Sequence, residues 1–344
     1  MIGRLLFSAT LISTVAAQSN STREVVYTTL DACPHGGCPS PLFDKGYLIQ
    51  LKDYRGGYPS DGYDLWAPDG TLLHHVDILA PDGTAGHVQD VAIDTDGVAI
   101  VPISYGGWGG PGHVKGGGLV VVDPAGKQVR FISTDRWLPA HACFGPDHSI
   151  WASGTQYEPL RDGDDFDHHS RGDYLIVRKY SLNGQLLGAF LPRSSFPPGL
   201  PPADYGKLRA ASDRIGVLTH PGKVGKYPEW VELGLDGNLI GRWKLGPDSV
   251  SDPDTHRATY QLNELAFTAD GRLFALPSDY VSHKRQIMIF DRATSSWKPS
   301  DAVGIPPVQS ELVGADGDNL AFERRNGSVE VIWKPLTPRE RSVE

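Results

Sequence analysis

Positive charge is scarce in this sequence. Its 344 residues contain 32 lysines and arginines against 41 aspartates and glutamates, which gives a formal net charge of −9 at neutral pH. Such a balance argues against nucleic acid or an anionic membrane as the main partner, and it is compatible with a protein that binds cations or neutral molecules. Long apolar runs are also missing after the first residues, so we expect no membrane insertion of the mature protein.

Motifs that would identify a reaction are missing as well. The patterns Gly-x-Ser-x-Gly, His-Glu-x-x-His and Cys-x-x-Cys do not occur. Among the 3 cysteines, Cys33 and Cys38 are close enough in sequence for a local disulfide, with two unpaired surface thiols as the alternative. Cys143 lies within an apolar segment and is expected to be a small buried side chain.

The first residues of the chain form an apolar stretch. Arg4 precedes the apolar residues Leu5–Val15, and Val15-Ala16-Ala17 offers small side chains for cleavage before Gln18. This pattern is typical of a secretory signal peptide, with a membrane anchor that stays in place as the alternative. We therefore expect a secreted or periplasmic protein.

The sequence is rich in glycine and proline, with 40 and 27 residues, and it contains a repeated unit of short strands. In the clearest copy, 260–297, Asp270-Gly271 separates two apolar strands, and two further strands follow. Asp-Gly between apolar runs predicts a hairpin, because glycine accepts the positive φ that such a turn requires. Five other approximate copies align with it; the first starts at Tyr47–Leu51 and the poorest lies at 208–245. Four hairpin-linked strands form one blade of a β-propeller.

The sequence therefore predicts an all-β fold, a six-bladed β-propeller. The sixth copy ends one strand early, after Val329–Trp333, and Glu24–Thr29 is a strand with no other partner, so we expect this N-terminal strand to close the ring. A seventh blade hidden near Phe196–Pro202 and a large β-sandwich are the alternatives. The expected organisation is a signal peptide (1–17), an N-terminal segment with the closing strand (18–41), the propeller (42–336) and a C-terminal tail (337–344).

The repeated unit also resembles a known family. Asn263–Phe267, Asp270–Ala275 and Ile287–Asp291 are similar to the NHL repeat and to the related propellers of the gluconolactonase–regucalcin superfamily, and the resemblance covers most of residues 42–336 at the level of the repeat. Members of the lactonase group hold a divalent metal over the axial channel with Glu, Asn and Asp side chains, and their Glu-Gly-Pro signature is absent here. The resemblance implies a six-bladed propeller and, as one alternative for function, a metal-dependent hydrolase or lactonase.

When the copies are aligned on their first strands, one column contains polar residues: Asp90, His141, Glu264 and Glu311, with Arg209 near the same place in the fourth copy. In a propeller these strand starts border the central channel, where charged side chains either face water or share a cation, because unpaired charges are costly to bury. The side chains of Asp90, His141, Glu264 and Glu311 suit a divalent cation such as Ca²⁺ or Zn²⁺. Arg209 would orient an anionic substrate group, and His141 or Glu264 would accept a proton. A water-filled channel lined by mutually hydrogen-bonded side chains is the alternative.

These expectations favour binding of a small molecule at the channel mouth, or of a protein or glycan at the loop face, with or without a divalent cation. The alternative is a metal-dependent hydrolase, lactonase or lyase at the axial site, so the sequence leaves open whether the protein is an enzyme. We expect a monomer that does not bind nucleic acid.

Overall fold

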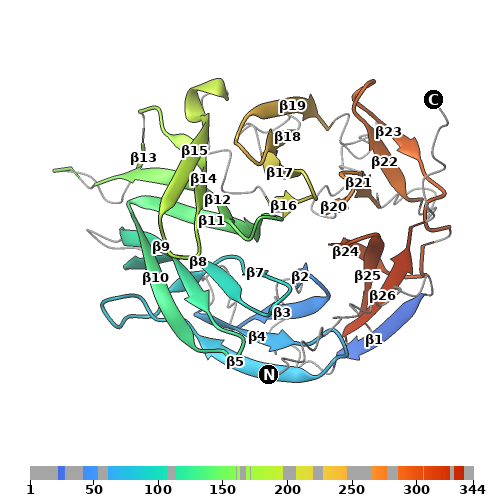
Figure 1. Cartoon of the computed structure of the whole chain (residues 1–344), viewed down its shortest axis with the longest axis horizontal. Helices are drawn as coiled ribbons and strands as arrows, with labels where there is room; N and C mark the ends of the chain where they lie inside the picture. The colour runs from blue at the N-terminus through green and yellow to red at the C-terminus, as the bar shows by residue number, and fades with distance from the viewer. Residues whose placement is uncertain are drawn as a thin grey trace, which may run out of the picture.

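The computed structural model describes residues 22–27, 42–52, 61–106, 114–159, 161–162, 168–170, 172–196, 207–219, 228–245, 265–276, 286–304, 306–325 and 329–336. These residues form 26 β-strands and one short 3₁₀-helix, η1 (Arg193–Ser195). The strands make six antiparallel sheets that stand as blades around a common axis (Figure 1). The predicted six-bladed β-propeller is confirmed, and the seven-bladed and β-sandwich alternatives are wrong. In the part of the chain that the structure describes, no helix has the length and apolarity to cross a membrane.

Within each blade the first strand lies nearest the axis and the later strands lie further out (Figure 1). Blade 1 consists of β2 (Leu42–Asp44), β3 (Tyr47–Leu51), β4 (Gly62–Trp66) and β5 (Leu72–Asp77). Blade 2 consists of β6 (His87–Val88), β7 (Ala92–Ile93), β8 (Ala99–Gly106), β9 (Val114–Val122) and β10 (Gln128–Asp135). Blade 3 consists of β11 (Trp137–Phe144), β12 (Ile150–Glu158), β13 (His168–His169), β14 (Leu175–Tyr180) and β15 (Leu186–Pro192). Blade 4 consists of β16 (Leu208–Ala210), β17 (Arg214–Thr219), β18 (Glu229–Gly234) and β19 (Leu239–Lys244). Blade 5 consists of β20 (Leu265–Phe267), β21 (Leu273–Ala275), β22 (Met288–Asp291) and β23 (Ser296–Pro299). Blade 6 consists of β24 (Glu311–Asp316), β25 (Asn319–Arg325), β26 (Val329–Pro335) and, outermost, β1 (Arg23–Tyr27).

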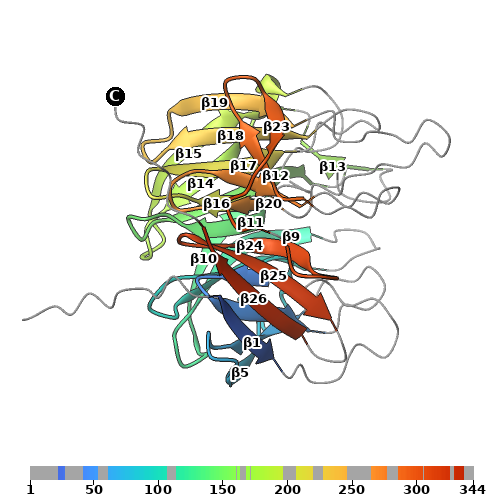
Figure 2. The same ribbon diagram turned by 90° about the vertical axis from the view of Figure 1, so that its right-hand side faces the viewer.

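The N-terminal strand closes the ring, as the sequence predicted. β1 pairs antiparallel with β26, with Val25 opposite Val331, and Figure 2 shows β1, β26 and β25 side by side. The alternation of side chains along β1 explains the fit, because Val25 and Tyr27 are buried among apolar residues of blades 1 and 6 while Val26 points outward. The sixth blade therefore joins the two ends of the described chain.

Blade 1 begins earlier than the repeat alignment predicted. The alignment started the first copy at Tyr47–Leu51, but this segment is the second strand, and β2 lies between it and the axis. A strand of three residues is too short to show the alternating pattern by which strands are recognised. The correction places Asp44, the last residue of β2, beside the axis.

Apolar side chains that pack between neighbouring sheets hold the blades together. Trp230 of blade 4 meets Phe267 of blade 5 edge-on, with ring centroids 5.0 Å apart. Phe43 of blade 1 meets Trp333 of blade 6 in the same way at 6.4 Å. Burial of a large apolar side chain contributes roughly 2 kcal/mol. Aromatic contacts therefore contribute to the packing at both of these seams.

Glycines in the outer turns explain why the Asp-Gly signal recurs. Gly237, between β18 and β19, has φ of 85°, and a Cβ built on it would lie 1.9 Å from Cε1 of Phe190 in blade 3. Gly70 and Gly126 occupy the same turn in blades 1 and 2 with φ of 90° and 81°, and each also lies against the preceding blade. The position requires both a positive φ and the lack of a side chain, and glycine satisfies both conditions.

The two ends of the ring differ in their connections. First and second strands, and third and fourth strands, are joined by tight turns at one end, as where Gly97 N donates to Asp94 O at 2.9 Å. The connections from second to third strand and from blade to blade emerge at the opposite end, and most of them are longer in sequence, although Arg136 alone joins β10 to β11. Residues at the start and at the end of an inner strand therefore lie at different depths along the axis.

Candidate functional site

The innermost strands of blades 1 to 4 bring charged side chains together at the axis. We call this group, which consists of Asp44, Asp90, His141, Lys207 and Arg209, the axial cluster. The strands that carry or adjoin these residues, β2, β7, β11 and β16, lie around the centre of the ring (Figure 1). Residues from four blades thus meet although they are far apart in sequence.

Asp90 occupies a break in the inner edge of blade 2, between β6 and β7. The residue is 5% exposed. Its Oδ1 accepts the N–H of Val91 at 3.0 Å, and its Oδ2 accepts the N–H of Ala142 at 3.4 Å and lies 3.1 Å from Nδ1 of His141. Burial raises the pKa of Asp90, but the hydrogen bond from His141 and the charges of His141, Arg209 and Lys207 outweigh it, so the pKa is lowered overall. Asp90 is therefore a buried carboxylate with matched donors.

His141 faces Asp90 from β11 of the next blade, and 15% of its side chain is exposed. Because an ionised carboxylate only accepts hydrogen bonds, Nδ1 of His141 must carry the proton that it shares with Asp90. In the neutral ring Nε2 then keeps its lone pair. This nitrogen can accept a hydrogen bond or a proton, or bind a cation.

Arg209 reaches the axis from β16, the innermost strand of blade 4, which adjoins β11 of blade 3. Its charge helps to lower the pKa of Asp90 in blade 2 and opposes the rise in the pKa of Asp44 in blade 1, so the guanidinium lies within electrostatic range of both carboxyls. Its Nη1 donates to the carbonyl oxygen of Leu208 at 2.8 Å, and the side chain makes no other hydrogen bond to the described part of the chain. Lys207, at the start of β16, adds a second positive charge near Asp90.

Asp44 and Cys143 complete the surroundings of the axis. Oδ2 of Asp44 accepts the N–H of Ile93 in blade 2 at 3.0 Å. Burial raises the pKa of Asp44 although Lys45, Ile93 and Arg209 act against it. Cys143, two residues beyond His141, is a free and buried thiol whose pKa burial raises, as expected for a small buried side chain. The sequence alone does not point to Asp44, because β2 is too short to be recognised as a strand.

The predicted site residues divide into three sets. Asp90, His141 and Arg209 come together at the axis, as the alignment predicted. Glu311 begins β24 and is exposed, and none of its described contacts reaches Asp90 or His141. Glu264 lies outside the described residues. Within the described ranges no group of three metal-ligating side chains is found, so the predicted cation site at Asp90, His141, Glu264 and Glu311 stays a prediction.

The seam between blades 2 and 3 carries a second aspartate–histidine pair. His148, in the turn between β11 and β12, has φ of 57°, where the corresponding turns of blades 2 and 5 have Gly97 and Gly271 at 80° and 79°. Its Nδ1 lies 2.7 Å from Oδ2 of Asp94, and its side chain is 59% exposed. The hydrogen bond that His148 donates to Asp94 raises the pKa of His148. This pair lies at the surface, whereas the Asp90–His141 pair lies at the axis.

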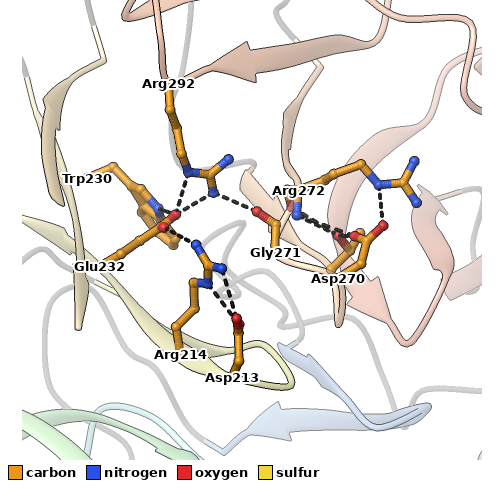
Figure 3. A network of polar contacts seen from close by, with 9 residues as sticks. Asp213, Arg214, Trp230, Glu232, Asp270, Gly271, Arg272 and Arg292 are labelled. Atoms are coloured by element: carbon orange, nitrogen blue, oxygen red, sulfur yellow. Dashed lines mark hydrogen bonds and ion pairs between the residues drawn. The ribbon is translucent and has the colours of Figure 1, made fainter. Parts of the chain in front are cut away.

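A separate group of charges lies between blades 4 and 5, and we call it the Glu232 network (Figure 3). Glu232 is fully buried, and its Oε1 accepts Trp230 Nε1 at 2.8 Å and Arg292 Nε at 2.9 Å. Its Oε2 accepts Arg214 Nη1 at 3.1 Å, and Arg214 also binds both oxygens of Asp213. Arg292 extends from blade 5 and donates to the carbonyl oxygen of Gly271 as well. Every charge in this network has a partner inside the protein.

Comparison with known proteins supports the fold and goes no further. No family model and no curated protein matches the chain. A "putative exported protein" from Bacteroides fragilis NCTC 9343 superposes with a TM-score of 0.50 at 8% identity, covering 92% of this chain and 95% of that one. A protein of unknown function from Bacteroides caccae has a TM-score of 0.45 at 11% identity over 87% and 94% of the two chains. A "putative gluconolactonase" has a TM-score of 0.45 at 13% identity over 92% of each chain. The first likeness agrees with the propeller fold, and the assignment to the NHL repeat stays a prediction.

Proposed function

We propose that the protein binds a small molecule at the axial cluster, where Asp90, His141 and Arg209 contact it. The observation that carries this proposal is the hydrogen bond between Asp90 and His141, which joins two blades through residues 51 positions apart, with Arg209 facing them from a third blade. Buried charges are costly, and the ring does not need them to hold its blades together. Blades 5 and 6, for example, meet through an apolar cluster that includes Ala266 and Leu312.

The exposure of the cluster supports the same proposal. Asp90 is shielded, while His141 and Arg209 are only partly buried, so a solute that reaches the axis would meet the imidazole and the guanidinium before the carboxylate. Asp90 would then hold His141 in one orientation and tautomer. A ligand would find an acceptor at Nε2 of His141 and donors on Arg209.

A hydrolase or lyase is a second candidate function, and the Asp90–His141 hydrogen bond favours it. A histidine held by a carboxylate can take a proton from water or substrate through its free nitrogen, and a nearby guanidinium can stabilise the negative charge that develops. In the metal-dependent form of this candidate, a divalent cation held with the help of Glu264 and Glu311 would polarise the substrate. The signal peptide expected at residues 1–17 supports the proposal that the protein acts outside the cytoplasm.

A differential screen tests the binding proposal. Wild type, His141→Ala and Arg209→Gln would be screened by thermal shift against one library of neutral, cationic and anionic metabolites, and hits would be confirmed by calorimetry. We expect hits on the wild type that both variants lose. Arg130→Gln, which removes an exposed guanidinium from outer strand β10, is the matched control and should keep them. Hits that survive in both axial variants would place binding elsewhere and contradict the proposal.

Metal analysis separates the second candidate from simple binding. Stoichiometric Ca²⁺ or Zn²⁺ in the purified wild type, lost in a Glu264→Gln/His141→Ala double variant, is the result expected of the metal-dependent form. Metal-free protein with axial hits from the library contradicts that form and leaves the binding proposal standing.

A further inference from the structure

We infer that the ligand of the axial cluster carries a carboxylate group, and that the guanidinium of Arg209 holds it. This inference rests on the function proposed above, and it adds the chemical class of the ligand. The evidence for it is that some hydrogen-bonding groups at the axis already bind other groups of the protein, whereas others have no such partner.

The carboxylate of Asp90 has its donors. Two backbone N–H groups, of Val91 and Ala142, and the Nδ1–H of His141 point at its two oxygens. A carboxylate held by several donors is satisfied without a guanidinium. Arg209 acts on Asp90 through its charge, and no hydrogen bond joins the two within the described residues.

Arg209 therefore has donors left over. A guanidinium has five N–H groups, and in the described part of the chain Arg209 uses one nitrogen, Nη1, to bind the carbonyl oxygen of its neighbour Leu208. Arg214 and Arg292 differ in this respect, because both bind the carboxylate of Glu232 directly. Arg209 is thus a partly buried guanidinium at the axis without a bound carboxylate.

The other acid that the structure describes at the axis does not fill this role. Asp44 accepts the N–H of Ile93, and burial raises its pKa even with Lys45 and Arg209 nearby. A carboxyl whose pKa is raised is a poorer counter-ion than an ordinary aspartate. Lys207 adds a further positive charge on the side of Asp90.

The geometry of a guanidinium selects the anion. Its planar fork matches the two oxygens of a carboxylate, which it binds through parallel hydrogen bonds. The protein as a whole carries a formal charge of −9, so an anion is attracted by the local field at the axis and not by the net charge. His141 beside it offers Nε2 to a donor on the same ligand.

Pairs of probes that differ only in charge test this inference. Propionate and propionamide, and benzoate and benzamide, would be titrated against the wild type at constant ionic strength, with binding followed by saturation-transfer NMR. We expect each carboxylate to bind roughly tenfold to a hundredfold more tightly than its amide, the range that hydrogen bonds between charged groups provide. Arg209→Gln should abolish the difference, Arg209→Lys should keep part of it, and Arg130→Gln should leave it unchanged.

The outcomes separate this inference from the function on which it rests. Amides that bind as well as carboxylates, or a carboxylate preference that persists in a folded Arg209→Gln, overturn the inference. The inference is also overturned if neither propionate nor benzoate binds to the wild type while the library hits still depend on His141. In each of these cases the proposal that a small molecule binds at the axial cluster still stands. Library hits that are indifferent to both His141→Ala and Arg209→Gln overturn the proposed function and this inference with it. Circular dichroism of each variant, and the charge-retaining Arg209→Lys, distinguish lost binding from lost folding.

Discussion

The Glu232 network and the axial cluster both place charges inside the ring, and they differ in how completely those charges are matched. In the Glu232 network both oxygens of a fully buried carboxylate are bound by arginines from two blades. In the axial cluster Asp90 is matched, whereas Arg209 binds only a carbonyl of its own strand within the described residues. A group in which every charged side chain binds a side chain of opposite charge can hold blades together but has no unmatched charge to offer a ligand. Function is therefore to be sought where a charged side chain binds no opposite charge, and the larger and more buried network is the structural one.

The largest expected effect is on the Glu232 network. Glu232→Gln keeps the volume of the side chain but removes the charge that faces Arg214 and Arg292. We expect a loss of about 3–5 kcal/mol in the free energy of unfolding, measured in urea, because breaking a buried pair leaves its partners uncompensated. Glu24→Gln is the control, since its carboxylate lies 3.6 Å from Arg324 and is 54% exposed. The control should change stability by no more than about 0.5 kcal/mol, and equal losses in the two variants would contradict the contrast.

Asp90→Asn should cost less than Glu232→Gln. We expect a loss of about 1–3 kcal/mol at pH 7, because an amide accepts the hydrogen bonds of Val91 and Ala142 less strongly than a carboxylate does. The pKa of Asp90 is lowered in the folded protein, so its contribution is present above about pH 4 and is lost as pH falls through the folded pKa. Stability curves of wild type and variant should converge on the acid side. Curves that stay parallel down to pH 2 would rule out this assignment of the shift.

Asp44→Asn should change stability in the opposite direction. Burial raises the folded pKa of Asp44, so ionising this carboxyl at neutral pH destabilises the protein. The amide imitates the protonated acid and can still accept the N–H of Ile93, and we expect a gain of a few tenths to about 1 kcal/mol at pH 7. The gain should disappear as pH falls below the pKa of an unfolded aspartate, about 4. If the variant is less stable than the wild type at pH 7, the charges of Lys45 and Arg209 affect the pKa of Asp44 more than burial does.

The smallest expected effect is at the pair of Asp94 and His148, in which the histidine is exposed. His148→Asn keeps a residue that tolerates a positive φ but removes the ionisable ring. The raised pKa of His148 means that its contribution is fully present below the unfolded value of about 6.5 and is lost as pH rises through the folded pKa. Melting temperatures should therefore differ at pH 5 and coincide at pH 9. If the two melting temperatures differ by the same amount from pH 5 to pH 9, the effect of the substitution comes from backbone strain or packing and not from the charge of His148.

The repeat made most of the fold predictable from the sequence. The turns that join the strands of a blade repeatedly place a glycine at positive φ, as at Gly237 and Gly271, so the Asp-Gly signal recurs and marks the blades. The closing strand was predictable because Glu24–Thr29 is rich in residues that favour strands and has no other partner, and the last copy lacked a strand. β2 was not predictable, since three residues give no period.

Three of the five residues of the axial cluster followed from the same alignment. Asp90 and His141 occupy equivalent positions in the repeat and Arg209 lies near the same place in the fourth copy, so a column of polar residues pointed to them. Asp44 lies at the other end of its strand and belongs to no such column. Arg292 and Glu232 are 60 residues apart, and their contact depends on how two blades are placed, for which no local pattern exists.

The pairing of β1 with β26 has a consequence for how the protein is made. Val25 is synthesised 306 residues before its partner Val331 (331 − 25 = 306). Blades 1 to 5 are complete within continuous segments and can form while the chain is still growing, whereas the sixth sheet must wait until β26 has been made. Until β26 pairs with it, β1 presents an unpaired edge, and this is the stage at which two nascent copies could exchange this strand.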